Sequence, residues 1–584
     1  MKMSSNDYGG CAIAIALSLF VRPAAALPTL GDLDTSFNAA GTTPGTIITT
    51  ASYYHDYAYA IAMQADGKIV VAGSWMNPAG TDAALVRYAA DGSLDSSFDG
   101  DGIVTTDFGS TIERAAGLVV QPDGKLVVML DGISNGTDRD FALARYNADG
   151  GLDTNFGNGG LVLTDFGSTY DKVGGIALQS DGKLVVSGYI DPGGSVFDYA
   201  LARYNNDGSL DTDFGTDGKV TTSLGTNNDW DVTVTLQPDG KIVIGSAYSQ
   251  PGGSDFFLAR YTSDGSLDTT FNPSGSLAAG VVTTDMGDTY ESVTGVLVQP
   301  DGKIVATGRS GSVFALARFN VDGSLDGGFG TGGKLIYDLG GTSAQANAVA
   351  LQPNGKIVLA GYSSNASDSD FAVVRFTPDG TPEGARVDPI GASSDSVYTV
   401  ALQPDGKIVA AGYAQNGTYN DIAVARYLSN DAPWDLTPDA FSFTDASGVG
   451  QGSVQTSNMI TVAGLDGGVS VPVTVSGGEY AVNGATTYTS APGWVQNGDT
   501  VNVRQTAGSN GGQTTDTVLT VGGIMPGNDL AGILGTTVSD TFSVTTSSGG
   551  GGGTLGPWSI ALFIAACRGR RRRARQRGAA LFSR

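Results

Sequence analysis

The stretch VVQPDGKLVV, residues 119–128, decides the fold, because the chain repeats it seven times with small changes. Two apolar runs flank a tight turn in which Pro122 presets φ, Asp123 takes the second central position and Gly124 accepts a positive φ. The pattern predicts a β-hairpin. A catalytic residue would not ordinarily recur in all seven repeats. We therefore interpret PDGK as a hairpin turn with Lys125 on an exposed rim.

The repeats have a period typical of a propeller, solenoid or array. The Q-x-[DN]-G-K block starts at Gln64, Gln121, Gln179, Gln237, Gln299, Gln352 and Gln403. Each unit also contains a FALARY-like strand, and most units continue through a DG-x-LD turn into a GVVTTD-like strand. Four strands in each of seven units predict a seven-bladed β-propeller. A parallel β-solenoid is the alternative, but it would have shorter coils and distinct caps.

The two ends of the repeat region indicate a closed ring. The segment GTIITT, residues 45–50, resembles the fourth strand of a unit but precedes the first block, and no such strand follows IAVARY at residues 422–427. An N-terminal strand that completes the last blade would remove the open edge of the ring. The chain has 87 glycines, and only four of its 58 acidic residues are glutamates, which favours turns over helices and an all-β protein.

The repeat region, from GDLDTSF at residue 31 to IAVARY at residue 427, resembles the bacterial delta-60 repeat family. This resemblance implies a secreted propeller protein without an assigned activity. The expected propeller covers residues 27–432. Residues 433–546 contain runs such as GVSVPVTV and DTVLTVGG, which predict a small β-sandwich. That part resembles the immunoglobulin-like modules that bacterial surface proteins place next to their anchors, which implies a stalk.

The first 26 residues are typical of a signal peptide, with Lys2, an apolar run and a small-residue site at Ala24–Ala26. At the other end we expect a glycine-rich linker at 547–554, a hydrophobic segment at 555–567 and a basic cytoplasmic tail at 568–584. These last segments resemble the GlyGly-CTERM sorting signal of Gram-negative bacteria. The resemblance implies cleavage by a rhombosortase-type intramembrane protease and display on the cell surface or outer membrane. The alternative is an inner-membrane anchor that leaves the protein facing the periplasm.

Charge and composition exclude several classes of function. The formal charge is −26, and both ends are basic, so the body of the chain is more acidic still and will repel nucleic acid. His55 is the only histidine, and the two cysteines, Cys11 and Cys567, lie in the terminal segments, so a Cys/His zinc site is excluded. A carboxylate-based enzyme needs a unique acid/base pair, whereas the acidic patterns recur in every repeat. We therefore predict no catalytic residues.

One register of the repeats suggests a metal site. Eight residues before the repeat glutamine stand six carboxylates, with Ala344 as the exception: Asp56, Glu113, Asp171, Asp229, Glu291 and Asp395. Like charges held close in a ring on one face of the propeller repel unless a cation or hydrogen-bond donors neutralise them, so we predict that the ring binds a divalent cation such as calcium. The alternative is that each carboxylate caps its own turn or pairs within its blade. In the DG-x-LD turns we expect Arg145 to pair with Asp153, and Arg203 with Asp211.

Recognition should lie where the repeats differ, and the segments after VVAG vary most. Several begin with an aromatic residue, namely Trp75, Tyr189, Tyr248, Tyr362 and Tyr413. Such rings can stack on an extracellular glycan or anchor a surface protein, although ordinary rim packing is the alternative. The sequence therefore predicts an exported, non-enzymatic β-propeller that acts as a binding or adhesion module. The other possibilities are a polysaccharide-degrading enzyme that uses carboxylates and a purely structural envelope protein.

Overall fold

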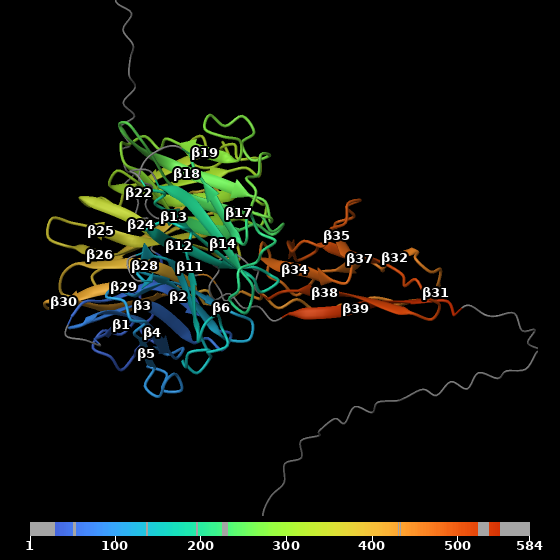
Figure 1. Cartoon of the computed structure of the whole chain (residues 1–584), viewed down its shortest axis with the longest axis horizontal. Helices are drawn as coiled ribbons and strands as arrows, with labels where there is room; N and C mark the ends of the chain where they lie inside the picture. Colours follow the sequence, from blue (N-terminus) through green and yellow to red (C-terminus); the bar gives the residue numbers. More distant parts are fainter. Residues whose placement is uncertain are drawn as a thin grey trace, which may run out of the picture.

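The computed structural model describes residues 30–50, 54–135, 138–193, 197–224, 232–403, 405–429, 431, 434–523 and 537–548. Throughout these ranges, every regular element is a β-strand, which confirms the all-β prediction (Figure 1). Within the same ranges no helix is long and apolar enough to cross a membrane. The expected signal peptide, hydrophobic segment and basic tail lie outside the described residues, as does nearly all of the glycine-rich linker.

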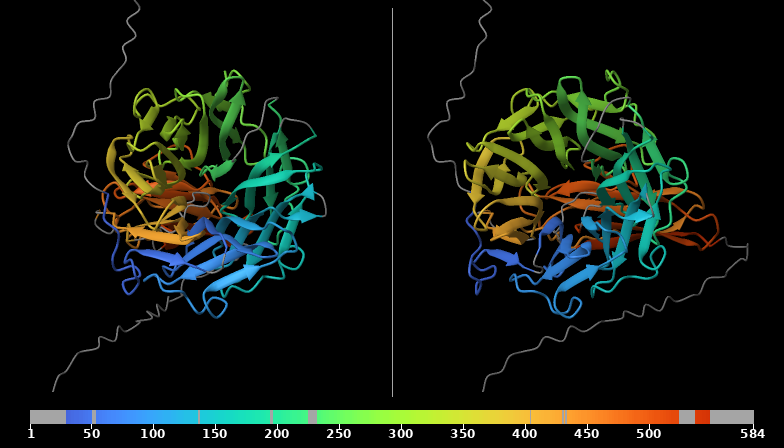
Figure 2. Two further views of the ribbon diagram at one scale, coloured as in Figure 1. Left: turned by 90° about the vertical axis from the view of Figure 1, so that its left-hand side faces the viewer. Right: turned by 60° about the vertical axis from the view of Figure 1, so that its left-hand side comes forward.

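Seven four-stranded antiparallel sheets form the predicted propeller, and Figure 2 shows them arranged in a ring. Blade 1 contains β2 (Asp56–Met63), β3 (Ile69–Asn77), β4 (Gly80–Tyr88) and β5 (Ile103–Thr106). Blade 2 contains β6 (Arg114–Val120), β7 (Leu126–Asp131), β10 (Phe141–Tyr146) and β11 (Leu161–Thr164), with a small hairpin of β8 (Ser134–Asn135) and β9 (Asp138–Arg139). Blade 3 contains β12 (Asp171–Leu178), β13 (Leu184–Ile190), β14 (Asp198–Tyr204) and β15 (Lys219–Thr222).

The later blades repeat this order. Blade 4 contains β16 (Thr233–Leu236), β17 (Ile242–Gln250), β18 (Gly253–Tyr261) and β19 (Val281–Thr284). Blade 5 contains β20 (Glu291–Val298), β21 (Ile304–Ser310), β22 (Val313–Phe319) and β23 (Lys334–Tyr337). Blade 6 contains β24 (Ser343–Leu351), β25 (Ile357–Ser364), β26 (Ser369–Phe376) and β27 (Pro382–Asp388). Blade 7 contains β28 (Asp395–Leu402), β29 (Ile408–Asn416), β30 (Tyr419–Tyr427) and β1 (Thr46–Thr49).

The ring closes as the sequence predicts. Strand β1 pairs antiparallel with β30, and Ile47 lies opposite Val424, so the two ends of the repeat region share blade 7. Beyond this strand pair, Asp34 accepts a hydrogen bond from Arg426 Nε at 2.8 Å. The N-terminal segment thus supplies both the outer strand and the buried carboxylate of the last blade. No edge of blade 7 is left open on the β30 side.

The PDGK block forms the predicted hairpin turn. In blade 2 the N–H of Gly124 donates to Gln121 O at 2.9 Å, the N–H of Gln121 donates to Lys125 O at 2.8 Å, and Gly124 has φ +84°. Lys125 is not on an exposed rim, however. Its ammonium lies 2.9 Å from the Asp153 carboxylate, with only 29% of the side chain exposed. The lysine therefore belongs to a charge network that the turn sequence alone does not reveal.

The arginines of the third strands build that network, and the predicted ion pairs are confirmed. Arg145 Nε lies 2.8 Å from Asp153, and Arg203 Nε lies 2.6 Å from Asp211. The guanidinium of Arg145 also lies 4.5 Å from the centre of the Phe156 ring and donates to the Asn206 carbonyl of the next blade. Each such arginine therefore closes the turn of its own blade and bonds to the backbone of the following blade.

The C-terminal part consists of two β-sheets that share a buried core. One sheet has the order β31 (Ala446–Val449), β39 (Val538–Thr546), β38 (Thr514–Val521), β34 (Ser470–Ser476) and β36 (Gly493–Gln496). In the other, β37 (Thr500–Thr506) pairs with β32 (Val454–Thr456), β33 (Ile460–Thr461) and β35 (Glu479–Val482). Val501 and Val503 of one sheet are fully buried, as are Leu519 and Val521 of the other, in one cluster of apolar side chains.

This sandwich attaches to one face of the propeller. We call the face that carries the Q-x-[DN]-G-K turns the turn face, and the opposite face, where each inner strand begins, the entry face. Asp431, in the linker, pairs with Lys356 at 2.9 Å and Arg375 at 3.0 Å, and the N–H of Ser470 donates to Pro353 O at 3.3 Å. Because Pro353 and Lys356 belong to a turn-face hairpin, the sandwich lies behind the ring when the entry face is viewed (Figure 2).

Candidate functional site

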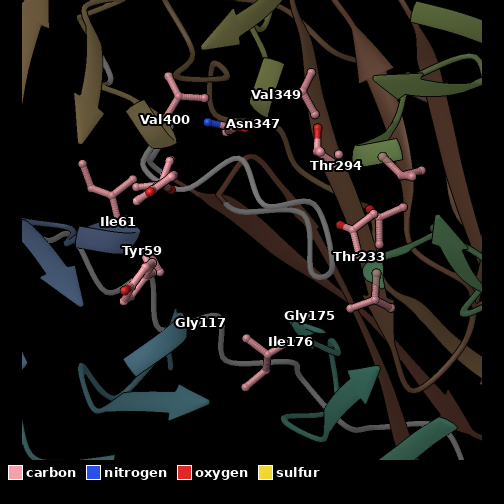
Figure 3. Close-up of a pocket in the computed structure, with 18 of the residues that line it drawn as sticks. Tyr59, Ile61, Gly117, Gly175, Ile176, Thr233, Thr294, Asn347, Val349 and Val400 are labelled. Atoms are coloured by element: carbon pink, nitrogen blue, oxygen red, sulfur yellow. The ribbon is translucent and has the colours of Figure 1, made fainter. Parts of the chain in front are cut away.

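The inner strands of all seven blades surround a central cavity of about 260 Å³. Figure 3 shows side chains that line it; the lining comes from β2, β6, β12, β16, β20, β24 and β28 and, at Met129, from β7. Most of the lining is aliphatic or glycine, and among the described residues its aromatic side chains are Tyr59 and Tyr398. The cavity is thus asymmetric, although the blades around it are repeats.

A β-bulge in the inner strands explains this asymmetry. In six blades the pairing between the first and second strands skips one residue, and this extra residue lines the cavity. The skipped residues are Tyr59, Ala116, Gly174, Thr294, Asn347 and Tyr398. A bulged residue is left out of the ladder and re-aims its side chain. The bulge therefore presents to the cavity a position at which the repeats differ.

Several bulged residues also join neighbouring blades. Thr294 Oγ1 donates to Ala346 O at 2.7 Å, and Asn347 Nδ2 donates to Val397 O at 2.6 Å. At Gly174 a Cβ atom would lie 2.3 Å from the carbonyl oxygen of Val232, so only glycine fits there. Thr294 and Asn347 are accordingly each fixed against the backbone of the next blade, and the two tyrosines come from blades 1 and 7.

The tyrosines belong to a continuous group of rings at the junction of blades 7 and 1. We call this group the aromatic cluster; its members are Tyr54, His55, Tyr57, Tyr59, Tyr398, Tyr413 and Tyr419. The rings of Tyr59 and Tyr398 stack with centroids 5.6 Å apart, and those of Tyr57 and Tyr59 stack at 5.9 Å. All seven side chains are half-buried or exposed. The cluster begins at the entry face and leads into the cavity.

Polar groups hold the cluster in place, and burial keeps the hydroxyls of Tyr59, Tyr398 and Tyr413 neutral. The N–H of Asn420 donates to His55 Nδ1 at 3.2 Å, and the amide of Asn420 donates to the Tyr57 hydroxyl at 3.1 Å. Burial and then the neighbouring tyrosines raise the pKa of Tyr398 and of Tyr413. Burial also raises the pKa of Tyr59. At neutral pH these hydroxyls are therefore hydrogen-bond donors and acceptors, not charges.

The five aromatic residues predicted from the repeats fall into two groups. Tyr413 belongs to the aromatic cluster, and Trp75 and Tyr362 are half-buried at the ends of β3 and β25 nearest the entry face. Tyr189 and Tyr248 are buried in the apolar core between blades 3 and 4. This burial corrects the expectation that all five rings could face a ligand, because neighbouring side chains cover the last two. All five also lie within strands and do not begin loops.

The predicted carboxylates lie at the start of the inner strands and are buried. Asp229 lies outside the described residues; of the others, Glu113 accepts hydrogen bonds from the N–H groups of Phe108 and Ser110, both at 2.7 Å. Glu291 accepts equivalent bonds from Met286 and Asp288, and Asp171 from Phe166. Asp395 accepts bonds from Ile390 and Gly391, and Asp56 accepts one from Met76. Each carboxylate thus bonds to its own blade or entry loop, which was the alternative to a shared ring.

Three of these residues belong to separate acidic clusters at blade junctions. In each cluster the ligand oxygens of three carboxylates lie within 4.8 Å of one another. Within the described ranges the clusters are Asp82, Asp107 and Glu113; Asp140, Asp165 and Asp171; and Asp255, Asp285 and Glu291. Each takes one residue from the start of a third strand or directly before it, one that directly follows the fourth strand and one from the next blade. Sequence spacing did not reveal the first two members.

The two faces differ in how their carboxylates are neutralised. On the turn face, Arg145 and Lys125 flank Asp153, and hydrogen bonds and this positive charge lower the pKa of its carboxyl to about 2. In the acidic clusters, burial dominates, so the pKa values of Asp171, Glu113 and Glu291 are raised. Asp153 on the turn face is therefore paired with two cations, whereas in the described part of the chain no carboxylate of the three acidic clusters forms an ion pair.

The repeats match a known family model, described as "Domain of unknown function (DUF5122) beta-propeller". The matched segments are residues 64–98, 121–156, 179–214, 237–271, 299–329, 352–383 and 403–433. Seven segments of the chain match the DUF5122 model. Each match begins at the glutamine of the turn face, and the first five end at the phenylalanine whose ring contacts the buried arginine. The bulged residues lie outside the matches, and so does the glutamate or aspartate of each acidic cluster that opens an inner strand. Tyr413 and Tyr419 of the aromatic cluster lie inside the last match, so the DUF5122 matches cover the site only in part.

Other comparisons add little to the DUF5122 match. No curated protein matches the chain. Among solved structures, an unknown-function protein from Dyadobacter fermentans is 10% identical with a TM-score of 0.36, covering 66% of this chain and 99% of that one. The polysaccharide lyase Uly1 is 13% identical with a TM-score of 0.38, covering 69% and 98%. Sqt1 from Chaetomium thermophilum is 12% identical with a TM-score of 0.36, covering 62% and 80%. Likeness at this level carries no argument about function.

Proposed function

We propose that this protein is a non-enzymatic binding module that takes a neutral extracellular glycan on its entry face. The observation that carries the proposal is the aromatic cluster, in which Tyr57, Tyr59 and Tyr398 form one run of stacked rings beside the central cavity. Ring faces of this kind stack on the apolar faces of sugars, and neutral hydroxyls satisfy the sugar hydroxyls. The described part of the cluster contains no charged side chain.

The surroundings of the cluster support a neutral ligand. The acidic clusters lie on the same face, and the chain as a whole carries a formal charge of −26. A polymer of uronic acids or sulfated sugars would be repelled by this field, and so would nucleic acid. The side chains of Asn420 and Asn347 supply polar groups of no net charge next to the rings.

The position of the sandwich supports the choice of face. Its contacts with Lys356 and Pro353 cover part of the turn face, which leaves the entry face directed away from the stalk. In our proposal the chain is exported through the segment 1–26 and displayed after a rhombosortase-type protease cuts the tail at 555–584. The entry face then points outward from the cell surface. A chain that keeps its tail would present the same face to the periplasm.

The test is affinity electrophoresis of the full-length protein through gels that contain neutral polysaccharides. We expect at least one polymer to retard the wild-type protein, and Tyr57→Ala and Tyr413→Ala to weaken this binding about tenfold, or ~1.4 kcal/mol each. Tyr290→Ala is the matched control, because Tyr290 is a tyrosine on an entry loop, 66% exposed and outside the aromatic cluster. It should bind as the wild type does.

Two results would reject the proposal. If Tyr57→Ala, Tyr413→Ala and Tyr290→Ala all bind as the wild type does, the aromatic cluster is not the site. If incubation with a polysaccharide releases new reducing ends or unsaturated sugars, the protein is an enzyme, and the carboxylates of the entry face become the groups to substitute. A purely structural role would be favoured if no polysaccharide retards the protein and if cells that lack the protein have a defective envelope.

A further inference from the structure

We propose that the junction of blades 2 and 3 holds a divalent cation, best suited to Ca²⁺, between the carboxylates of Asp140, Asp165 and Asp171. The three oxygens that could serve as ligands lie within 4.8 Å of one another. Calcium binds oxygen ligands at about 2.3–2.6 Å, so two ligands on opposite sides of one ion are ~4.6–5.2 Å apart. The spacing therefore fits a single ion without rearrangement of the backbone.

Asp140 distinguishes this cluster from an ordinary acidic surface. Asp140 is only 5% exposed, and in the described part of the chain its carboxylate has no hydrogen-bond or ion-pair partner. In the sister clusters the equivalent residue is satisfied by an amide, since Asn77 donates to Asp82 at 2.7 Å and Gln250 donates to Asp255 at 2.8 Å. A buried carboxylate that faces two others and has no donor is costly unless a cation completes it.

The other two ligands are already oriented. The Phe166 N–H donates to Asp171 Oδ2 at 2.8 Å, and Ser168 Oγ donates to Asp171 Oδ1. The N–H of Gly167 donates to Asp165 Oδ1, where Gly167 adopts φ +84°. These bonds leave lone pairs on both carboxylates, and Asp165 is exposed, which gives an ion a route from solvent.

Nearby positive side chains are engaged elsewhere. Lys219 Nζ donates to the backbone oxygen of Asp165 at 2.9 Å and lies 5.5 Å from the Phe166 ring. Arg139 donates to the Tyr170 hydroxyl at 3.4 Å and lies over that ring. In the described part of the chain, neither forms an ion pair with the three carboxylates. Asp138 adds further negative charge, and burial together with Asp165, Asp171 and Asp138 raises the pKa of Asp140 to about 6.

At two other blade junctions the equivalent carboxylates are either missing or accompanied by a positive side chain. At the junction of blades 5 and 6, Val313 and Ala344 stand at the positions of Asp140 and Asp171, so two of the three carboxylates are lost together. In blade 6 the equivalent aspartate, Asp370, has Asp388 nearby, and Arg386 pairs with Asp388 at 2.6 Å. That junction therefore contains its own positive charge.

The test is isothermal calorimetry of the full-length protein, stripped with EDTA and titrated with calcium chloride at neutral pH. We expect saturable binding by the wild type and the loss of one site, or at least tenfold weaker binding at that site, in Asp140→Asn. Asp370→Asn is the matched control, because Arg386 already serves its junction, and it should keep the wild-type number of sites. Asp165→Asn tests the same site at an exposed position, where a folding defect is not expected.

Three outcomes would overturn the proposal. They are no saturable heat with wild-type protein, an unchanged number of sites and affinity in both Asp140→Asn and Asp165→Asn, or an equal loss in Asp370→Asn. Glycan binding by the Tyr57→Ala and Tyr413→Ala variants is measured separately, so that a failure of the cation proposal does not bear on the aromatic cluster.

Discussion

Arg260 offers the sharpest test of how the blades are held together. Its residue is 2% exposed; Nε lies 2.8 Å from Asp268, and Nη1 donates to Val321 O of the next blade at 2.6 Å. The guanidinium also lies 4.4 Å from the centre of the Phe271 ring. Arg260→Met keeps the apolar stem on that ring but removes the charge and both hydrogen bonds.

We expect Arg260→Met to lower the free energy of unfolding by about 3 kcal/mol. Removing one partner of a buried ion pair costs ~3–5 kcal/mol, because the other charge is left buried and unpaired. We expect a loss at the lower end of this range, because the ammonium of Lys241 remains 3.8 Å from the Asp268 carboxylate and still partly neutralises it. The added change Asp268→Asn should recover part of the loss, because a neutral amide tolerates burial better than an unpaired carboxylate.

The assay is urea unfolding at neutral pH, followed by circular dichroism. Arg114→Met is the control: Arg114 also pairs with an aspartate, Asp131 at 3.5 Å, but its side chain is 41% exposed, so we expect a loss of at most ~1 kcal/mol. If Arg260→Met and Arg114→Met lose equal stability, or if Asp268→Asn deepens the loss in the Arg260→Met protein, the buried network does not stabilise the ring as we argue.

Three more predictions concern pH, packing and closure. In EDTA, the melting temperature should fall as pH falls through the acid range, because the pKa of Asp153 in the folded protein is lowered to about 2. It should also fall as pH rises through about 6, because the pKa of Asp140 in the folded protein is raised to about 6, and calcium should abolish this second loss. Gly412→Ala should cost about 3 kcal/mol or more in urea unfolding, since its Cβ would lie 1.9 Å from Ser396 O, whereas Gly327→Ala, with open space around it, should change stability by less than ~0.5 kcal/mol. Deleting the chain through residue 50 removes β1, so gel filtration should show self-association through the exposed edge of β30, together with a lower melting temperature.

The fold could be predicted because its determinants are local and repeated. Gly124 needs a positive φ within a four-residue turn, and that requirement recurs in every unit, so seven weak signals reinforce one another. The missing fourth strand after residue 427 and the extra strand at residues 45–50 then determined how the ring closes. The pairing of Arg145 with Asp153 was also visible, because both residues lie on one turn.

The aromatic cluster could not be predicted because a bulge changes which way side chains point. Strict alternation along Asp56–Met63 places Ala58, Ala60 and Ala62 on one face, but the pairing skips Tyr59 and turns it into the cavity. The only signal was that repeats 1 and 7 have tyrosine where repeats 2 and 3 have alanine and glycine. Tyr59 and Tyr398 are far apart in the chain and meet only because the ring closes.

The acidic clusters were missed for a related reason. The sequence placed Asp171 correctly at the start of an inner strand, but the backbone N–H of Phe166 draws its carboxylate toward the loop of blade 2. Asp140 directly precedes β10 and Asp165 directly follows β11, and no spacing along the chain brings the three carboxylates together. A register that recurs in the repeats shows which residues are equivalent, but it does not show which of them are neighbours.

Hydrogen exchange of the full-length protein, with and without the polysaccharide that retards it most, tests the central claim most directly. We predict that binding protects the amides at the start of β2 and β28 and at the end of β29, which surround the aromatic cluster. The turn face and the sandwich should exchange at unchanged rates. Protection confined to the turn face or the sandwich, with none on β2 or β28, would contradict the assignment of the entry face as the binding surface.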